Sequence, residues 1–346
     1  MLRNKLYSIL LLSFISSFFS VHEAYAERTY GQIEPPRFKV GRFAVKYEMD
    51  RFQARDNFSK EGGGADLIGD FEAYNAYLGV ENDLSLKWSA SAGALLGLSR
   101  SKVGDDSRRN TDIKGLQFGV NRVLTTPGDQ ADNMFNLIGD LKLFLSFHDN
   151  VFGSDEVSIG DGTSWLQAGV WAGTDSFKYF RLWLYGGVNW PFRSYAKNFV
   201  FVVRPEFKLW GGRLGVGLEG QTPIIKDGDE DDPTDRLRLI DEYNAGSFYY
   251  QAVNPQFVAL NTWFGFQPAP LTEVKIGFGE ALSGRSAAQG IRVFATLEVS
   301  FSVTRTGYEF PYVKINRGGS KIQKNDGVRK LKNYAKPKGK PKFKKD

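Results

Sequence analysis

Residues 86–98 read LKWSASAGALLGL, a stretch in which apolar residues alternate with small or polar ones. Successive side chains of an extended strand point to opposite faces of a sheet. Leu86, Trp88 and Leu98 therefore share one face with the intervening alanines, whereas Lys87 shares the other face with serine and glycine. The stretch predicts a strand with one apolar face and one small, mostly polar face.

The same alternation recurs along the chain. Residues 291–303 read IRVFATLEVSFSV and alternate without interruption over 13 residues. A soluble strand usually has about 5–6 residues, whereas a tilted membrane strand has about 9–11 plus its ends. An even number of strands returns the chain to the side where it began, as bacterial barrels require. The pattern predicts an all-β, up-and-down antiparallel transmembrane barrel of about twelve strands, over residues 38–51, 68–81, 84–101, 112–124, 135–148, 163–174, 180–193, 198–209, 213–224, 257–267, 272–282 and 288–303.

The composition agrees with many strands that are apolar on one face only. Aromatic residues make up 14% of the chain, glycine accounts for 38 of its 346 residues, and the mean hydropathy is −0.34. The chain contains no cysteine, which excludes disulfides, a thiolate metal site and a lipoprotein anchor. His148 is the only histidine besides His22, which argues against an imidazole metal cluster. We therefore predict no cofactor.

The first residues have the pattern of an export signal. Arg3 and Lys5 precede the apolar stretch 6–19, and Ala24 and Ala26 form a small-x-small cleavage site. We expect residues 1–26 to be a cleaved signal peptide. Beyond it no apolar run is long enough for a transmembrane helix, so a membrane location requires a closed barrel.

These features together resemble a known class of protein. Residues 27–303 resemble a Gram-negative outer-membrane β-barrel of the porin-like class, and residues 290–301 are similar to the aromatic-ended final strands of such proteins. Here Phe301 is followed by a long tail instead of ending the chain. The resemblance implies a bacterial outer-membrane location, contact with outer-membrane lipid, and recognition by the barrel assembly machinery.

Aromatic residues and connection lengths predict how the barrel is oriented. We expect aromatic side chains near strand ends to lie at the headgroup level, namely Trp183, Trp190, Phe192, Tyr195, Phe199, Phe201 and Trp210. Short turns belong to the periplasmic side and long loops to the exterior. The short connections are near residues 81–83, 175–178, 211–212 and 268–271.

The longest outer connection, residues 225–256, combines acidic and apolar segments. Asp227, Asp229 and Asp231 have the early spacing of a calcium loop, but Asp232 replaces its glycine and Arg238 replaces its glutamate. We therefore favour a solvated acidic segment over a cation site. The same loop is expected to fold inward over the mouth, because it also contains Leu237, Leu239, Ile240, Phe248, Tyr249 and Tyr250.

If the apolar faces contact lipid, the opposite faces line the lumen. The predicted lumen-lining charges are Lys46, Glu48, Lys87, Asp140, Lys142, Arg181, Arg204, Glu206, Lys208, Arg213, Glu219, Lys275, Arg292 and Glu298. One interpretation is a charge-lined channel that biases which ions or small solutes pass. The alternative is a set of interior ion pairs that occlude and stiffen the barrel.

The chain after Val303 changes character. Residues 304–346 carry 14 Lys and Arg against 3 acidic residues, whereas the whole chain has a formal net charge of +6. We predict a disordered, cationic periplasmic tail, because the segment cannot bury a core. Its expected partners are peptidoglycan, lipid headgroups or an acidic periplasmic protein rather than nucleic acid, through Lys336, Lys338, Lys340, Lys342, Lys344 and Lys345. The alternative is a solubilising tail that has no partner.

Three functions follow from this sequence. We expect first a porin-like channel for small hydrophilic solutes or ions. The second is a closed structural or surface-interaction barrel that the basic tail tethers to the cell wall. The third is an outer-membrane hydrolase using His148 and Asp149, which we disfavour because no serine has the spacing of barrel lipases. We therefore predict that the protein is not an enzyme.

Overall fold

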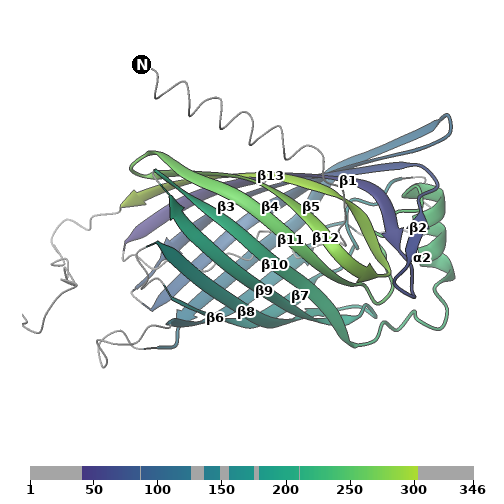
Figure 1. Cartoon of the computed structure of the whole chain (residues 1–346). Coiled ribbons are helices and arrows are strands. Elements are labelled where there is room, and N and C mark those ends of the chain that lie inside the picture. The colour runs from purple at the N-terminus through teal and green to yellow at the C-terminus, as the bar shows by residue number, and fades with distance from the viewer. Residues whose placement is uncertain are drawn as a thin grey trace, which may run out of the picture. The chain divides into compact units, whose positions relative to one another are not determined.

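The alternating stretches form the strands of a closed antiparallel barrel (Figure 1). The computed structural model describes residues 41–85, 87–125, 136–148, 156–174, 179–209 and 211–302. The predicted signal peptide and basic tail lie outside these described residues. The wall strands are β1 (Arg42–Phe58), β3 (Asp70–Asp83), β4 (Trp88–Val103), β5 (Asp106–Val123), β6 (Asn136–Ser146), β7 (Trp165–Thr174), β8 (Phe180–Pro191), β9 (Lys197–Leu209), β10 (Gly212–Ile225), β11 (Gln256–Ala269), β12 (Thr272–Arg285) and β13 (Ala287–Ser302).

Each wall strand pairs with its neighbours in chain order, and β13 pairs with β1 to close the barrel. The short strand β2 (Gly64–Asp66) pairs with the end of β1 and adds no wall strand. The described residues thus contain twelve wall strands, which confirms the predicted barrel. The strands β1 and β5 are longer than predicted, because β1 continues to Phe58 and β5 already begins at Asp106.

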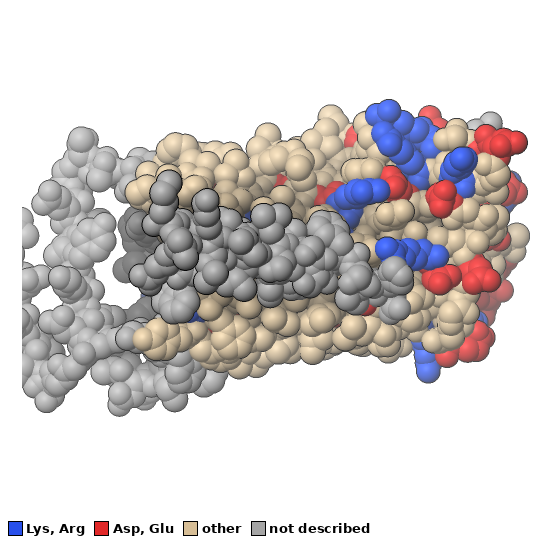
Figure 2. Space-filling view, turned by 45° about the horizontal axis from the view of Figure 1, so that its top comes forward, with Lys and Arg blue, Asp and Glu red and all other residues tan. Residues whose placement is uncertain are grey.

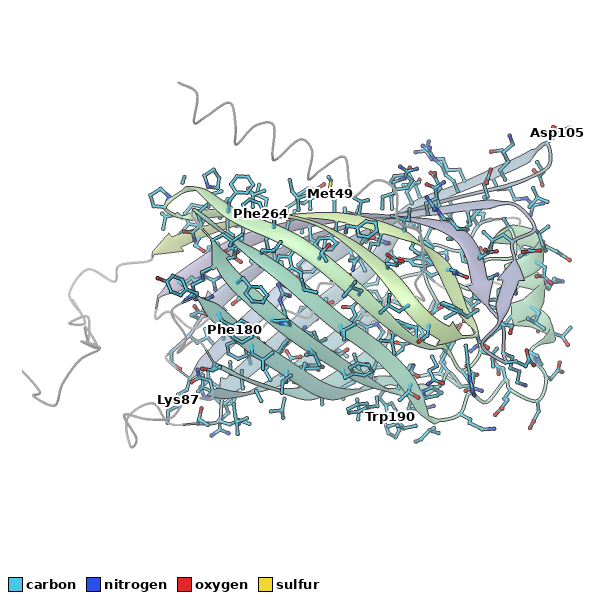
Figure 3. The ribbon with its side chains drawn as sticks, in the orientation of Figure 1. Met49, Lys87, Asp105, Phe180, Trp190 and Phe264 are labelled. Atoms are coloured by element: carbon cyan, nitrogen blue, oxygen red, sulfur yellow. The ribbon has the colours of Figure 1, made fainter. Side chains whose placement is uncertain are left out.

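The two faces of each strand differ as the period of two requires. On β1, Glu48 and Asp50 are buried, whereas Tyr47 and Met49, which alternate with them, are exposed. Figure 3 shows Met49, Phe264 and Trp190 on the outside of the wall. On the face visible in Figure 2, charged residues gather at one end, and other residue types cover the rest of the described wall. An outer surface of exposed apolar side chains suits contact with lipid.

The aromatic residues near strand ends divide between the two faces. Trp190 and Phe192 are exposed on the outer surface, the side on which a headgroup position would place them, and Trp210 lies outside the described residues. Trp183 was expected there too, but it is buried on the inner face, 6.4 Å from Trp171 between ring centroids. Tyr195 lies in the β8–β9 loop, where its hydroxyl donates to a backbone carbonyl. Alternation along β8 therefore predicts the face on which Trp183 lies, whereas the position of Trp183 near the strand end does not.

The barrel has a terminal end and a loop end. At the terminal end β1 begins and β13 finishes, whereas the loop end carries the long β6–β7 and β10–β11 connections. Not every loop-end connection is long. Residues 104–105 join β4 to β5, and Ser286 alone joins β12 to β13, because these strands extend past the mouth. Figure 3 shows Asp105 at the tip of the β4–β5 hairpin.

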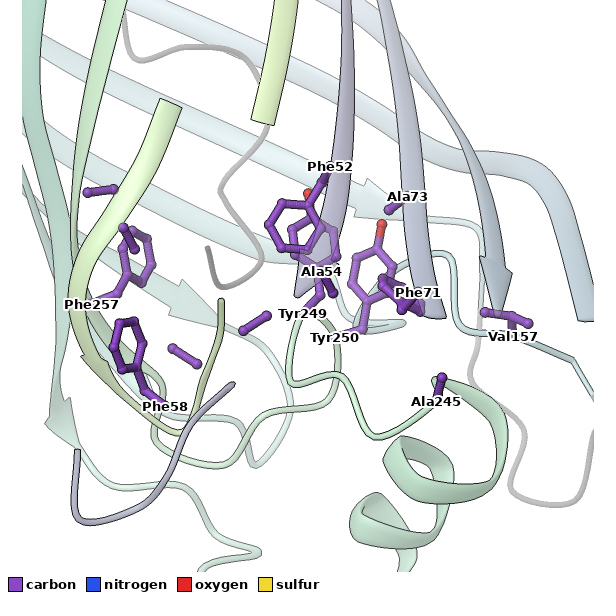
Figure 4. Packing of buried hydrophobic residues seen from close by; sticks show 14 residues of the cluster. Phe52, Ala54, Phe58, Phe71, Ala73, Val157, Ala245, Tyr249, Tyr250 and Phe257 are labelled. Carbon is purple, nitrogen blue, oxygen red and sulfur yellow. The ribbon is translucent and has the colours of Figure 1, made fainter. Parts of the chain in front are cut away.

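The longest loop, residues 226–255, folds back into the mouth, as predicted. It contains α2 (Thr234–Arg238) and one π-helical turn (Leu239–Tyr243), and its returning part packs against the inner wall. The ring of Tyr249 stacks on Phe52 with 4.1 Å between centroids (Figure 4). Among the apolar residues of this loop, Leu237 remains 41% exposed. In the described part of the chain, no helix is long and apolar enough to cross a membrane.

Candidate functional site: the barrel interior

Inward-facing aromatic rings lie along the wall, over glycines of neighbouring strands. A Cβ atom added to Gly215 on β10 would lie 1.8 Å from a ring carbon of Trp263 on β11. A Cβ on Gly277 would lie 2.0 Å from the ring of Phe294, and one on Gly93 would lie 2.5 Å from Tyr77. Glycine therefore lets a large ring lie flat against the strands. This packing gives the chain's high glycine and aromatic content one structural explanation.

The predicted lumen-lining residues lie on the inner face of the wall, with one exception. Lys87 is exposed in the β3–β4 turn at the terminal end, because β4 begins one residue later (Figure 3). The buried members of the set are Glu48, Asp140, Arg204, Glu206, Lys275 and Arg292. The partly buried members are Lys46, Lys142, Arg181, Lys208, Arg213, Glu219 and Glu298.

One group of these charges, the Arg292 cluster, joins β1 and β13. The Arg292 guanidinium lies 2.8 Å from an Asp50 carboxylate oxygen and 3.7 Å from Glu48. Lys46 lies 3.5 Å from the other carboxylate oxygen of Glu48. The register pairs Arg292 with Phe52, so these side chains meet between directly adjacent strands. Asp50 was missed in the sequence, although it continues the alternation of Lys46 and Glu48.

A second group, the Arg213 cluster, joins β9, β10 and β12. Arg213 lies 2.8 Å from Glu273 and 3.7 Å from Glu206. Arg204 lies 3.1 Å from Glu206, and Lys275 lies 3.5 Å from Glu273. The structure thus links four predicted residues with Glu273, which contacts Arg213 and Lys275 and lies two residues before Lys275 on the same face.

A third group, the Arg42 cluster, lies at the terminal end. Arg42 forms ion pairs with Glu298 of β13 and, at 2.9 Å and 3.6 Å, with Glu81 and Asp83 of β3. Its Nε atom also donates to the Ser300 hydroxyl at 3.2 Å. One guanidinium therefore faces three carboxylates near the point where the chain enters the barrel. Only Glu298 among these residues was predicted.

A further polar group, which mixes charged and neutral side chains, joins β6, β7 and β8. Lys142 lies 3.8 Å from Asp140 on β6, and the Tyr185 hydroxyl donates to Asp140 at 3.3 Å. Gln167 on β7 donates its side-chain amide to the same Tyr185 hydroxyl at 2.9 Å. These contacts also join side chains of the same strand or of nearby strands of the wall.

Lys114 lies in the interior, although strict alternation along β5 would place it on the outer face. It shares its parity with Leu116 and Phe118, which point outward. The pairing of β4 with β5 shifts between Leu95 and Leu96, and this bulge turns Lys114 inward. Its Nζ atom donates to Asn75 Oδ1 at 3.3 Å and lies 3.2 Å from the Tyr250 hydroxyl of the long loop.

Arg236 holds the acidic part of the long loop. This buried residue of α2 lies 2.7 Å from Asp227 and 3.0 Å from Asp229, and its guanidinium lies 3.7 Å from the ring centroid of Tyr195. Asp227 is itself buried, so the expectation of a purely solvated acidic segment is wrong at this position. Glu230 lies farther out and accepts a hydrogen bond from Lys226, which lowers the pKa of its carboxyl below the usual value.

A cavity of about 80 Å³ lies between the inner wall and the loops of the loop end. Its lining includes Phe144, Trp165, Asn189 and Asn198 from the wall and Tyr249 from the long loop. Ser146 and His148 line it too, and the Ser146 hydroxyl donates to the backbone carbonyl of His148 at 2.8 Å. Among the described residues, no group of three or more acidic or histidine side chains could hold a metal ion.

Comparisons with known proteins give matches at the level of fold. No family model matches the chain, and no curated protein matches it. An outer-membrane channel from Pseudomonas putida F1 is similar, with a TM-score of 0.59 at 12% identity, covering 80% of this chain and 100% of that one. The KdgM porin has a TM-score of 0.41 at 9% identity, covering 75% of this chain and 99% of that one. The translocator domain of the autotransporter NalP from Neisseria meningitidis has a TM-score of 0.41 at 9% identity, covering 77% of this chain and 90% of that one. With its twelve-stranded closure and apolar outer surface, the chain has the fold of the outer-membrane β-barrel proteins.

Proposed function

We propose that this protein is an outer-membrane channel that passes small hydrophilic solutes or ions through the barrel. The observation that carries this proposal is the position of the interior aromatic rings, which lie over wall glycines such as Gly215 and Gly277. The interior ion pairs described above likewise join residues of one strand or of strands at most two apart. Rings and charges arranged along the wall leave the axis of the barrel to solvent and solute.

In this proposal the inward-facing charges of the predicted set line the lumen, and Lys87 marks its terminal mouth. The terminal end faces the periplasm, where the tail contacts peptidoglycan or an acidic protein. The loop end faces the exterior. The assembly machinery recognises β13, whose Phe301 side chain is exposed on the outer surface. The protein performs no catalysis, and the Ser146 hydroxyl is engaged by a backbone carbonyl.

One observation favours the second candidate, a closed structural barrel. Residues 244–252 of the long loop enter the mouth and bury Tyr249 and Tyr250 against Phe52 and Phe71. A loop held permanently in this position would narrow the path at the loop end. The same loop in a channel acts as a constriction, which limits solute size.

Single-channel recording in planar bilayers tests the proposal. The protein beginning at Glu27 is compared with a variant that ends at Val303. We expect stable conductance steps from both forms, because the described wall is complete without the tail. A folded barrel that conducts no ions under any applied voltage would favour the structural barrel instead.

A further inference from the structure

Basic side chains form a patch on the outer wall at the loop end, where Figure 2 shows charged residues gathered. Arg100 on β4 is exposed, and its neighbours along the strand are buried serines, so it points away from the lumen. Arg109 on β5 is exposed on the same side, since Arg108 beside it turns to the mouth and lies over the ring of Tyr243. The outer basic patch consists of Arg51 on β1, Arg100 and Lys102 on β4, and Arg109 on β5.

The outer basic patch has more positive than negative charge. The register places Asp70 of β3 opposite Lys102 and Glu72 of β3 opposite Arg100, so four basic groups share this surface with two acidic groups. The carboxylate of Glu72 is already engaged. Arg51 lies 2.6 Å from one of its oxygens, and the Tyr74 hydroxyl donates to the other at 2.8 Å. The patch therefore carries an excess of two positive charges.

Two arginines of the patch are placed against each other. The register pairs Arg100 directly with Arg109, and like charges in this arrangement repel. Neither forms an ion pair with another residue of the described part of the chain. The guanidinium of Arg100 lies 5.8 Å from the ring centroid of Tyr74, which keeps it close to the wall. An anion bound between Arg100 and Arg109 would remove the repulsion.

The outer face of β4 places this patch at the edge of the apolar band. From Trp88 to Leu98, every second residue is a tryptophan, an alanine or a leucine that faces outward. At a rise of about 3.4 Å per residue and a tilt of about 40°, this stretch covers about 25 Å. That is the height of the band that crosses the membrane in outer-membrane barrels. Arg100 is the next outward residue, so it lies at the level of the lipid headgroups.

The apolar surface directly below the patch suits acyl chains. Leu96 on β4 and Ile113 on β5 are opposite each other in the register, and their side chains are 43% and 47% exposed. A molecule bound at Arg100 and Arg109 can therefore place an anionic group on the arginines and a hydrocarbon chain on this surface. This combination is that of a lipid, whereas a free anion would use only the arginines.

The charge of the patch indicates which headgroup it fits. Arginine recognises phosphate well, because its planar guanidinium donates parallel hydrogen bonds to two oxygens. A phosphate monoester carries about 1.5 to 2 negative charges near neutral pH, which matches the excess charge of the patch. We propose that the outer basic patch binds a lipid whose headgroup carries a phosphate monoester, with Arg100 and Arg109 holding the phosphate. The inference goes beyond the proposed channel, and in the proposed orientation this lipid belongs to the outer leaflet.

Binding is measured without conduction, by native mass spectrometry of the folded, detergent-solubilised protein beginning at Glu27. The titrated lipid is diphosphoryl lipid A, whose headgroup carries phosphate monoesters, and phosphatidylglycerol is the phosphodiester comparison. We expect lipid A to bind at least about tenfold more tightly, because it brings more charge to the arginines. Inorganic phosphate is added as a competitor and should not displace lipid A at equal concentration, because it makes no contact with Leu96 and Ile113.

The discriminating variant is Arg100→Gln combined with Arg109→Gln, which should weaken lipid A binding at least about tenfold. Its matched control is Arg122→Gln. Arg122 is also exposed on the outer face of β5, but it lies at the other edge of the apolar band and pairs with Trp88 instead of a second basic residue. The control should keep the affinity of the wild type. Lipid A should also raise the urea midpoint of the wild type and not that of the double variant.

Each result has a distinct meaning. Equal affinity of the wild type and the double variant for lipid A overturns the site, as does an equal loss in Arg122→Gln. Equal affinity for phosphatidylglycerol overturns the assignment of a phosphate monoester. Displacement by inorganic phosphate at equal concentration makes the patch a free-anion site and overturns the lipid. Binding of lipid A through Arg100 and Arg109 by a barrel that does not conduct supports the lipid site and overturns the channel.

Discussion

At the scale of single residues, glycine decides where the interior rings lie. The ring of Trp263 occupies space that any side chain at Gly215 would need, and the Phe294 ring has the same relation to Gly277. Two large aromatic residues thus contribute buried surface without projecting toward the barrel axis. The small face seen in residues 86–98 has the same consequence, since Gly93 accepts the ring of Tyr77.

The variant Gly215→Ala tests this relation. Its Cβ would lie 1.8 Å from Trp263, so the ring must turn away from the wall into the lumen. We expect a loss of about 1–3 kcal/mol in unfolding free energy, measured by urea titration, together with a smaller single-channel conductance. Gly139→Ala is the control, because the atom nearest to its Cβ lies 3.7 Å away, at the end of the Leu124 side chain. Unchanged conductance in Gly215→Ala would contradict the proposed open axis.

At the scale of elements, the long loop depends on one buried arginine. Replacing Arg236 by alanine leaves Asp227 buried without its guanidinium, which costs about 3–5 kcal/mol for a charge of this kind. We expect the loop to leave the mouth, with higher conductance and faster trypsin cleavage within residues 226–255. Lys226→Ala is the comparison, because its ion pair with Glu230 lies at the solvent-exposed surface and is expected to contribute little to stability. Equal trypsin resistance in both variants would show that Arg236 does not anchor the loop.

The elements also show what the sequence could predict. Period-two alternation depends on local geometry alone, so it placed the wall strands and the inner face that carries Arg292 and Glu48. It failed at Lys114, because the bulge between β4 and β5 is a property of strand pairing rather than of one strand. The contact of Arg236 with Asp227 depends on the path of a long loop, which no periodicity encodes.

At the scale of the whole molecule, the interior is a set of separate ion-pair clusters. The Arg292 and Arg213 clusters each combine basic and acidic side chains within a few neighbouring strands. Mixed charges of this kind give small local fields, so we expect weak selectivity between potassium and chloride. The Arg42 cluster differs, because a single guanidinium faces the carboxylates of Glu81, Asp83 and Glu298.

The variant Arg42→Ala therefore has the clearest expected effect on ion selectivity. Removing the guanidinium leaves three neighbouring carboxylates without their shared partner at the terminal mouth, and acidic groups that line a pore favour cations. In a potassium chloride gradient at low salt, the reversal potential should shift toward the potassium value, whereas Arg42→Lys, which keeps the charge, should shift it much less. Raising the salt to about 1 M shortens the screening length to about 3 Å and should reduce the shift. A reversal potential that is the same in the wild type and Arg42→Ala would place the Arg42 cluster outside the ion path, because a permeating ion would not pass these carboxylates.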